Sequence, residues 1–458
     1  MSDNDFDVIV VGGGAAGVAC AAHLVQRGVR TLLVSETTEV GHNLRSVIVD
    51  GCRATVQHPT WMTTWNGGWW FRLVKELNVA VKFSIDKPFA VRTRSGDPEP
   101  IFLPICPSAR SLAEVLVSLS PIPVGDAVGE VEKVLEAGLA IPPDKLLEMH
   151  DVSIDAWMTE IDASDFARFF ITTIVANLMG FSAETIASSL SVFGGFGMIR
   201  CFVGFEGLCV SFDPDAREGL LIPIARRIEE LGGEIRRGQR VETVLIDDGQ
   251  VRGIRFADGT EVTSATVALG VGNHRIAAIV DPLPPEYLPS MSYGEDTLQR
   301  EFGTCTVLNT PILPANLEQM MFVIDDDGSN LIWFVPLHSM QPWVTDGRQV
   351  IYCELNLSAK KSAEFADNDA IFAHMHDVCE ELYPGWKAAI AETKGMEHGH
   401  LWTGPMFTGP KMPRDIESIK GLWYAGDSGT PHGIGIEAAM GAGYVTASKI
   451  LTTRNGSS

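Results

Sequence analysis

The chain has few basic residues and a strong acidic excess. Its 458 residues include 35 Lys and Arg against 58 Asp and Glu, which gives a formal net charge of −23. A sequence pI near 4.8 argues against a nucleic-acid partner, because phosphate contacts require a basic face. None of the eight cysteines forms a C-x-x-C pair, so neither a zinc ribbon nor a thioredoxin-like site is indicated. We expect free thiols in a reducing compartment.

We expect neither a secretory signal nor an internal repeat in this sequence. Residues 1–5 carry no basic segment, so we expect no secretory signal and predict a cytoplasmic protein. The uncharged stretch 8–25 approaches the lower length limit of a membrane span. It reads, however, as a strand followed by a helix, which is typical of a buried α/β core. The mean hydropathy of +0.12 leaves room for a hydrophobic substrate or for peripheral membrane contact.

The N-terminal residues follow the pattern of strand, glycine-rich loop, helix and strand. Residues 6–11 (FDVIVV) are apolar and β-branched, residues 12–17 read GGGAAG, and a helix-like segment then runs to Arg27. Residues 29–35 (VRTLLVS) predict a second strand. Because a G-x-G-x-x-G motif lies in register with both strands, this segment is predicted to bind a dinucleotide.

Each position of the glycine loop has a physical role in binding a pyrophosphate. Gly12 permits the tight turn, Gly14 lets the backbone approach the phosphates, and Gly17 lets the helix lie close to the strand. Ala15 and Ala16 begin the helix, whose free N–H groups and positive dipole end face the phosphates. The loop is therefore a predicted pyrophosphate site.

An acidic residue closes the second strand. Glu36 can accept hydrogen bonds from both ribose hydroxyls of an adenosine, and it would repel a 2′-phosphate, so NADP is disfavoured. A second motif of this kind is missing, because Gly270-Val271-Gly272 lacks the remaining spacing. We therefore expect no built-in NAD(P)H site and infer that electrons pass between the organic substrate and an external electron acceptor.

The C-terminal region resembles that of a flavoprotein family. Residues 421–427 (GLWYAGD) read as a short strand that ends in Gly-Asp, and a helix-like run follows at 434–451. Together with the N-terminal unit, this resembles the FAD-dependent amine oxidases, phytoene desaturases and carotenoid isomerases. The resemblance implies FAD as the cofactor, with Gly426 and Asp427 closing over its pyrophosphate and ribityl chain.

The resemblance also assigns further FAD contacts. Gly435 and Ile436 begin the C-terminal helix, which in the family points its N-terminus at the N1/O2 edge of the flavin. The residue that matches Val241 holds the adenine through its backbone. Such a helix end suits the negative charge that a reduced flavin carries near N1.

The resemblance extends to the middle of the chain and predicts a discontinuous domain. Residues 219–233 read as an amphipathic helix, residues 234–256 as strands, and residues 262–270 as a strand returning to the core. The expected fold is α/β, with a Rossmann-like FAD-binding domain and an inserted α+β substrate domain. The predicted boundaries are listed here: 1–85, 205–275 and 415–458 for the FAD domain, and 86–204 and 276–414 for the substrate domain.

One segment departs from the family pattern. Where the family has Gly-Gly followed by Arg, this sequence has Gly41-His42 followed by Arg45. Gly41 stays a predicted cofactor contact, and His42 must either point away from the cofactor or contact it. Arg45 could compensate by reaching the pyrophosphate. A covalent flavin link through His42 is an alternative.

Two histidines are the candidate catalytic residues. His58 lies in a stretch that returns past the flavin in the resembling family, and imidazole carries protons near neutral pH. His432 stands beside the start of the C-terminal helix, where it could stabilise reduced flavin or a substrate oxygen. A structural role is the alternative for both. His398 and His400 are too few for a metal site, so no metal is predicted.

The predicted function is FAD-dependent dehydrogenation or desaturation. Three unusually apolar segments, at 61–70, 166–179 and 191–208, favour a small hydrophobic organic substrate, isoprenoid or terpenoid in kind, that gives hydride to flavin N5. The alternatives are an amine oxidase, a redox-neutral FAD-dependent isomerase, and a non-enzymatic lipid-binding chaperone of the same fold. A homo- or hetero-oligomer is also open.

Overall fold

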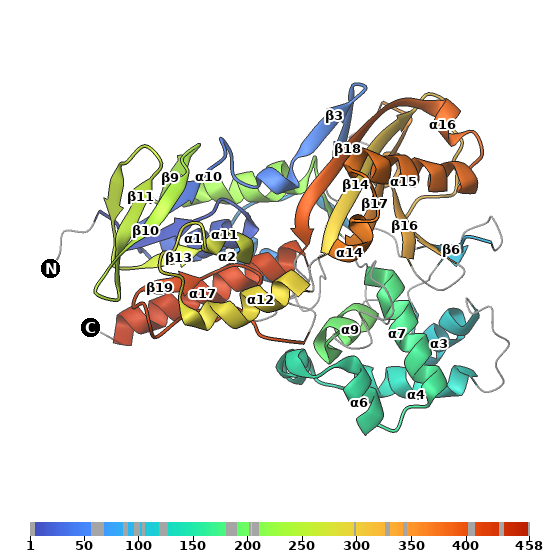
Figure 1. Cartoon of the computed structure of the whole chain (residues 1–458), viewed down its shortest axis with the longest axis horizontal. Helices are drawn as coiled ribbons and strands as arrows, with labels where there is room; N and C mark the ends of the chain where they lie inside the picture. Colours follow the sequence, from blue (N-terminus) through green and yellow to red (C-terminus); the bar gives the residue numbers. More distant parts are fainter. Residues whose placement is uncertain are drawn as a thin grey trace.

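The computed structural model covers the whole chain of 458 residues (Figure 1). The structure describes residues 5–456 with internal gaps. The gaps are 56–67, 86–89, 96–100, 103–105, 119–126, 180–189, 201–202, 204–209, 297–298, 326–329, 342–345, 402–407 and 430–434.

The first sheet is parallel and has five strands. Its order is β19-β13-β1-β2-β9, and every adjacent pair runs parallel. The strand bounds are β1 Val8–Val11, β2 Thr31–Ser35, β9 Glu234–Arg237, β13 Val267–Leu269 and β19 Leu422–Tyr424. Apolar side chains on both faces of these strands are buried, as expected of a parallel sheet covered on both sides.

Helices cover one face of this sheet and a small sheet covers the other. Val8, Val10 and Leu33 point into a core shared with four helices, and Ile9 and Leu32 point into a second core shared with the small sheet. The helices are α1 Ala15–Val25, α2 Trp69–Leu77, α10 Ile222–Glu230 and α17 Ile436–Gly456. The small antiparallel sheet consists of β10 Val241–Asp247, β11 Gln250–Phe256 and β12 Glu261–Thr263. The helices α11 Asn273–Ile276 and α12 Leu288–Asp296 contribute Ile276 and Met291 to that second core.

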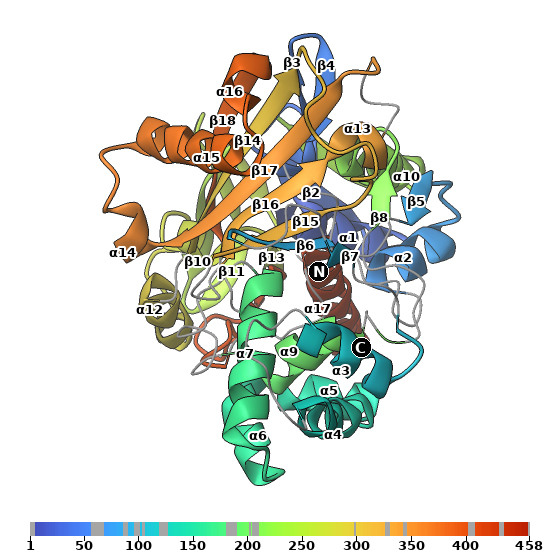
Figure 2. The same ribbon diagram turned by 90° about the vertical axis from the view of Figure 1, so that its right-hand side faces the viewer.

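The second sheet has seven strands and forms a separate lobe. Its order is β18-β14-β17-β16-β15-β6-β7, and it is antiparallel except where β15 pairs with β6. The bounds are β6 Ala90–Thr93, β7 Ile101–Phe102, β14 Gln299–Leu308, β15 Met321–Ile324, β16 Asn330–Pro336, β17 Gln349–Ser358 and β18 Ile390–Leu401. Figure 2 shows this sheet above a layer of helices.

Each face of the second sheet packs against helices. One face shares a core with α15 Asn368–Leu382 and α16 Trp386–Ala389. The opposite face shares a core with a layer that we call the helical layer. It consists of α3 Ala109–Ser118, α4 Ala127–Leu139, α5 Pro143–Glu148, α6 Ile154–Glu160, α7 Asp165–Met179 and α9 Val192–Ile199.

Short elements join the two lobes. The hairpin of β3 Ser46–Val49 and β4 Cys52–Thr55 contacts the second sheet, and β5 Phe83–Ile85 pairs with β8 Val210–Phe212. The other short helices are α13 Leu337–Met340, α14 Ala359–Ser362, and the turns η1 His42–Leu44, η2 Met149–Asp151, η4 Arg217–Leu221 and η5 Pro285–Tyr287.

The predicted fold class is confirmed: a Rossmann-like parallel α/β unit accompanies an α+β lobe. The domain boundaries stay a prediction, although the five strands of the first sheet all fall within the segments expected for the FAD domain. Among the described residues, no helix combines the length and apolarity needed to cross a membrane.

Candidate cofactor-binding site

The glycine loop between β1 and α1 is shaped by close backbone contacts. A Cβ on Gly12 would lie 2.5 Å from the carbonyl oxygen of Gly270, and Gly12 has a φ of +118°. A Cβ on Gly17 would lie 1.8 Å from the carbonyl oxygen of Gly12, which is far inside contact distance. Only glycine fits at these two positions, so the loop can turn tightly and α1 can lie close to the sheet.

The third glycine faces open space instead. No heavy atom lies within 4 Å of a Cβ built on Gly14, the residue that caps the start of α1 without a side-chain hydrogen bond. Ala15 and Ala16 are buried in the first turn of α1. The free N–H groups of that turn and the positive end of the helix dipole therefore face an open cradle that suits an anionic pyrophosphate.

Glu36 lies where the sequence predicts it, directly after β2, and it has a partner that sequence reasoning missed. Its carboxylate accepts a hydrogen bond from Arg275 Nη2 at 2.8 Å, and both side chains are half-exposed. Arg275 belongs to α11, which follows the Gly270 turn. The carboxylate predicted to bind a ribose is thus held beside the glycine loop by a cation that lies 239 residues away in the sequence.

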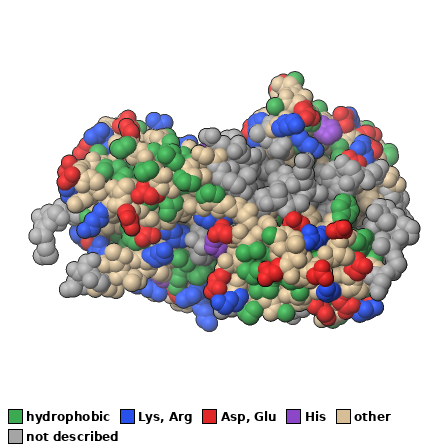
Figure 3. All heavy atoms as spheres, turned by 60° about the horizontal axis from the view of Figure 1, so that its bottom comes forward, with side chains coloured by type: hydrophobic (Ala, Val, Ile, Leu, Met, Phe, Trp, Pro, Cys, Tyr) green, Lys and Arg blue, Asp and Glu red, His purple; other side chains and the backbone are tan. Residues whose placement is uncertain are grey.

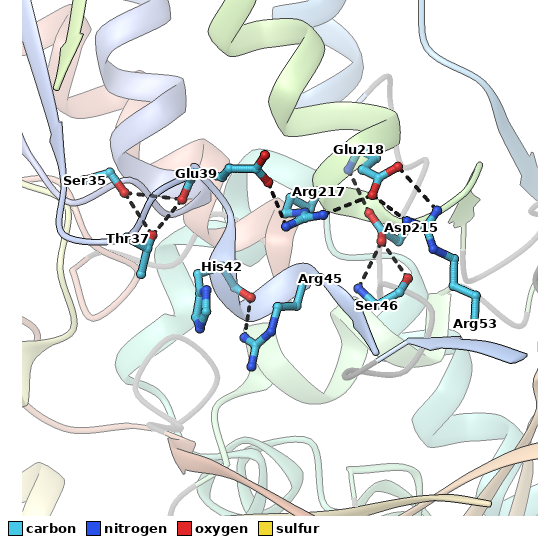
Figure 4. A network of polar contacts seen from close by, with 10 residues as sticks. All are labelled: Ser35, Thr37, Glu39, His42, Arg45, Ser46, Arg53, Asp215, Arg217 and Glu218. Atoms are coloured by element: carbon cyan, nitrogen blue, oxygen red, sulfur yellow. Dashed lines mark hydrogen bonds and ion pairs between the residues drawn. The ribbon is translucent and has the colours of Figure 1, made fainter. Parts of the chain in front are cut away.

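The turn after β2 packs directly on the glycine loop. Gly41, with a φ of +71°, donates its N–H to the carbonyl oxygen of Gly13 at 2.7 Å. His42 is exposed, and Arg45 Nη1 donates to the His42 carbonyl oxygen at 2.8 Å (Figure 4). Partial desolvation and the charges of Arg45 and Arg217 lower the pKa of His42. Neither the pyrophosphate role of Arg45 nor a covalent role of His42 is tested by this geometry.

A polar network anchors that turn to the start of η4 (Figure 4). Asp215 is buried and accepts hydrogen bonds from the N–H of Ser46 at 3.0 Å and its hydroxyl at 2.6 Å. Arg217 pairs with Glu39 at 2.8 Å and with Glu218 at 3.0 Å. The predicted contacts at 41–45 therefore sit on a fixed support.

The loop after β19 lies at the same edge of the first sheet. Gly426 and Asp427 follow the strand, and Met412 donates its N–H to the Ser428 carbonyl oxygen at 2.9 Å. The guanidinium of buried Arg414 lies 3.3 Å from a Cβ built on Gly429. Burial raises the pKa of Asp427, and backbone hydrogen bonds at Asp427 and Ser428 oppose that effect.

Arg414 ties this loop to α17. Its Nη1 donates to the Ala442 carbonyl oxygen at 3.1 Å and to Thr446 Oγ1 at 2.8 Å, and burial lowers its pKa to about 10. Its own carbonyl oxygen accepts from the N–H of Tyr424 at 2.7 Å. No sequence motif indicates a role for Arg414, because its partners are brought together only by the fold.

The start of α17 completes the site. Gly435, with a φ of +59°, precedes Ile436, the first residue of the helix. Gly443 of α17 packs against Ala16 and Cys20 of α1, so the two helices lie in contact. The glycine loop, the turn at Gly41, the Gly426 loop and the start of α17 therefore meet at one edge of the parallel sheet.

The comparisons with known proteins agree with this geometry. The sequence profile of a family described as FAD dependent oxidoreductase matches residues 7–106. A chloroplastic prolycopene isomerase of Arabidopsis thaliana is 24% identical over 288 residues, which cover 55% of this chain and 47% of the plant protein. The match thus spans about half the length of that relative.

Solved structures share the fold over nearly the whole chain. An oxidoreductase from Methanosarcina mazei superposes with a TM-score of 0.71 at 16% identity, covering 96% of this chain and 99% of the other. Wild-type putrescine oxidase bound to putrescine superposes with a TM-score of 0.66 at 16% identity, covering 98% and 99%. The chain is similar to the FAD-dependent oxidoreductases over residues 7–106. Its cofactor is FAD.

The structure describes only some of the other predicted site residues. Val241 begins β10, and its N–H and carbonyl lie in the strand paired with Phe256. His58 and His432, the candidate catalytic residues, fall outside the described residues, as do Trp61 and Trp65. The roles of these residues, and of the whole predicted site, stay predictions.

The described residues of the three apolar segments do not all lie in one core. Trp70 is buried in the core of the FAD-binding lobe, where its ring meets Phe71, Phe83 and Phe212 edge-on. Its burial there follows from α2 packing against α1 and α17. In contrast, α9 carries Phe193 and Phe196 into the core between the second sheet and the helical layer.

A buried polar cluster lies on the sheet face toward that same core. Tyr352 donates its hydroxyl hydrogen bond to Glu301 at 3.2 Å, and Glu301 in turn hydrogen-bonds with Glu354. Asn356 Nδ2 donates to Glu354 at 3.0 Å. Burial raises the pKa of Glu354 to about 8, which favours a proton shared within the carboxyl pair. The sequence signal for this cluster was only a polar residue at alternate strand positions.

The described surface carries charges of both signs. Figure 3 shows acidic and basic side chains intermixed with hydrophobic ones on the face that it presents. Among the residues whose side chains are described, no group of three His, Cys, Asp or Glu forms a metal cluster.

Proposed function

We propose that this protein is an FAD-dependent dehydrogenase or desaturase acting on a hydrophobic, isoprenoid-like substrate. The observation that carries the proposal is the apolar core between the second sheet and the helical layer. Trp157, Phe193 and Phe196 from the helices meet Phe322 and Trp333 from the sheet there. This lobe faces the cofactor edge of the first sheet (Figure 1), so an apolar chain bound beside this core would lie next to the cofactor site.

The relative named prolycopene isomerase supports this substrate class by its name. Its alignment covers only about half of its length, and the substrate therefore remains part of the proposal. Three segments of this sequence are strongly apolar at the same time as the chain carries a net charge of −23. An apolar interior suits a hydrophobic substrate. The net negative charge of the exterior opposes association of the protein in water.

The chain's own residues would bind the cofactor and orient the substrate. The first turn of α1, with Gly12, Gly14 and Gly17, would hold the pyrophosphate, and Glu36 would hold the ribose. Bound FAD supplies a hydride acceptor. The substrate carbon loses a hydride, a neighbouring carbon loses a proton to a base or water, and a C=C bond forms. An external acceptor then removes the two electrons.

The test is anaerobic single turnover with the purified, FAD-loaded protein. Terpenoid or carotenoid-like substrates should bleach the visible flavin absorption, and deuterium at the abstracted position should slow the bleaching several-fold. Absence of any isotope effect would exclude rate-limiting hydride removal. A product isomerised without net flavin reduction would assign the redox-neutral isomerase reaction instead.

One observation favours amine oxidation as a second candidate. The Tyr352, Glu301 and Glu354 cluster is buried on the face toward the apolar core, where a carboxylate would attract an ammonium group. The solved structure of putrescine oxidase bound to putrescine shares the fold, although its low identity shows the fold alone.

The two candidates are separated by one variant. Amines of increasing chain length are offered beside terpenoids, with wild type and Glu354→Gln compared under the same conditions. If amines are the substrates, Glu354→Gln should raise the amine KM about tenfold or more, since a buried ion pair is lost. If terpenoids are the substrates, amines should leave the flavin oxidised, and the terpenoid KM should change less than threefold.

A further inference from the structure

A buried carboxyl group joins α17 to α2. Glu437, in the first turn of α17, has only 3% of its surface exposed. The backbone N–H groups of Trp69 and Trp70 donate to its two carboxyl oxygens, the second at 3.3 Å. These are the first two N–H groups of α2, which have no partner within their own helix. Glu437 therefore caps α2 from another helix.

The backbone around this contact is fitted to the carboxyl group. A Cβ on Gly68 would lie 2.6 Å from Glu437 Oε1, so a larger residue at 68 would displace the cap. Trp70 is fixed in the core beyond the cap. The contact joins residues 368 positions apart in the sequence, so it forms only in the tertiary fold.

The contact lies at the cofactor edge of the molecule. α17 runs parallel to α1, since Gly443 meets Ala16 and Cys20 while Ser448, further along, meets His23. At a rise of 1.5 Å per residue, α17 begins about 6 Å beyond the start of α1, on the side of the second lobe. A cofactor whose pyrophosphate lies at the start of α1 and which extends toward the second lobe passes the first turn of α17.

The remaining charged groups of the neighbouring helices gather elsewhere. Glu76 and Arg72 of α2, with His23 and Arg27 of α1, surround Tyr444, two turns further along α17. Asp427 lies in the loop before α17 and is a further titratable group among the described residues of that loop. Burial raises the pKa of Glu437 to about 8 against the opposing effect of its two N–H donors.

We propose that Glu437 is a positioning residue that holds α2 to the cofactor end of α17 and takes up a proton from solvent when the bound FAD is reduced. Two-electron reduction adds negative charge to the flavin, and a second negative charge in the same dry helix turn would be repelled. Above pH 8 the carboxylate therefore becomes a neutral carboxyl group as the flavin accepts two electrons and one proton. The inference rests on FAD binding, and it does not depend on the proposed substrate.

The experiment measures the midpoint potential of bound FAD against pH, from pH 7 to 10, with a reference dye. One proton per two electrons gives a slope of about 30 mV per pH unit, and two protons give about 59 mV. For the wild type, we expect the plot of midpoint potential against pH to have a steep segment above pH 8, with a slope approaching about 59 mV per pH unit. Glu437→Gln should keep the smaller slope throughout, whereas Glu437→Asp should retain the steep segment.

The matched control is Glu76→Gln, which loosens the other end of α2 but removes a carboxylate whose pKa is lowered. Glu76→Gln should leave the slope of midpoint potential against pH as it is in the wild type over the whole pH range. If Glu437→Gln keeps the steep segment, the proton belongs to a group other than Glu437 and the proposal fails. If Glu437→Gln does not bind FAD, the test is the number of protons that the wild type takes up from solvent on two-electron reduction at pH 9. Uptake of two protons supports the proposal, and uptake of one overturns it.

Discussion

At the scale of single residues, two glycines of the same motif have different roles, one in packing and one in cofactor binding. Gly17 lacks a side chain because the backbone of Gly12 occupies the space, whereas Gly14 lacks one although nothing in the protein occupies that space. We therefore predict that Gly17→Ala destabilises the free protein by about 2 kcal/mol through steric overlap. Gly14→Ala should leave the free protein within about 1 kcal/mol of wild type, the range of an N-cap change.

FAD binding separates the two variants. Gly14→Ala should raise the FAD dissociation constant at least tenfold, because the new methyl group fills the cradle that a pyrophosphate would occupy. The measurements are thermal unfolding without FAD and flavin fluorescence titration with FAD. A Gly14→Ala protein that binds FAD as tightly as wild type would show that the pyrophosphate does not approach this residue.

At the scale of elements, a buried arginine caps the C-terminal end of α4. Arg200, which follows α9, donates from Nη2 to the carbonyl oxygens of Gly138 and Leu139, each at 3.2 Å, and also to that of Ile141. Its side chain is buried, with 6% exposed. Replacing it by Met leaves these carbonyl groups without their donor, so we predict a loss of about 3 kcal/mol.

The loss should be confined to the helical layer. Hydrogen exchange of Arg200→Met should accelerate in α4 and α9, while amides of the parallel sheet keep their protection. Arg110→Met is the control, because Arg110 makes exposed pairs with Glu114 and Glu132 and should change stability by less than 1 kcal/mol. Equal losses for both variants would contradict a capping role for Arg200.

The same scale shows what sequence could predict. The unit from β1 to β2 was predictable because its strands, glycine loop and helix are neighbours in the chain, and because Gly17 meets the backbone of Gly12, five residues before it. The pairing of Glu36 with Arg275 and of Glu437 with the start of α2 could not be predicted, since these contacts join residues 239 and 368 positions apart. The order of the second sheet was unpredictable for the same reason, because β6 joins it beside β15.

At the scale of the whole molecule, the FAD-binding lobe depends on three helices held by one polar cluster. His23 of α1 is 3% exposed, hydrogen-bonds with Ser448 of α17 at 3.0 Å, and lies 3.7 Å from Glu76 of α2. Tyr444 donates to the same Glu76 at 2.8 Å. The pyrophosphate helix, the α2 helix and the C-terminal helix thus share partners, so a change of charge at His23 acts on the entire lobe.

Acidification should therefore weaken the whole FAD-binding lobe through His23. Burial lowers the pKa of His23 to about 4, below its ordinary 6.5. The unfolded chain then binds the proton first, and stability falls as the pH drops from 6.5 toward 4, by about 3 kcal/mol at 1.36 kcal/mol per pH unit. Urea unfolding at pH 7 and pH 4.5 should show this loss in wild type and a smaller one in His23→Gln. Ser448→Ala, which removes only the hydrogen bond, should lower stability equally at both pH values, and a His23→Gln protein as acid-sensitive as wild type would assign the effect to other groups.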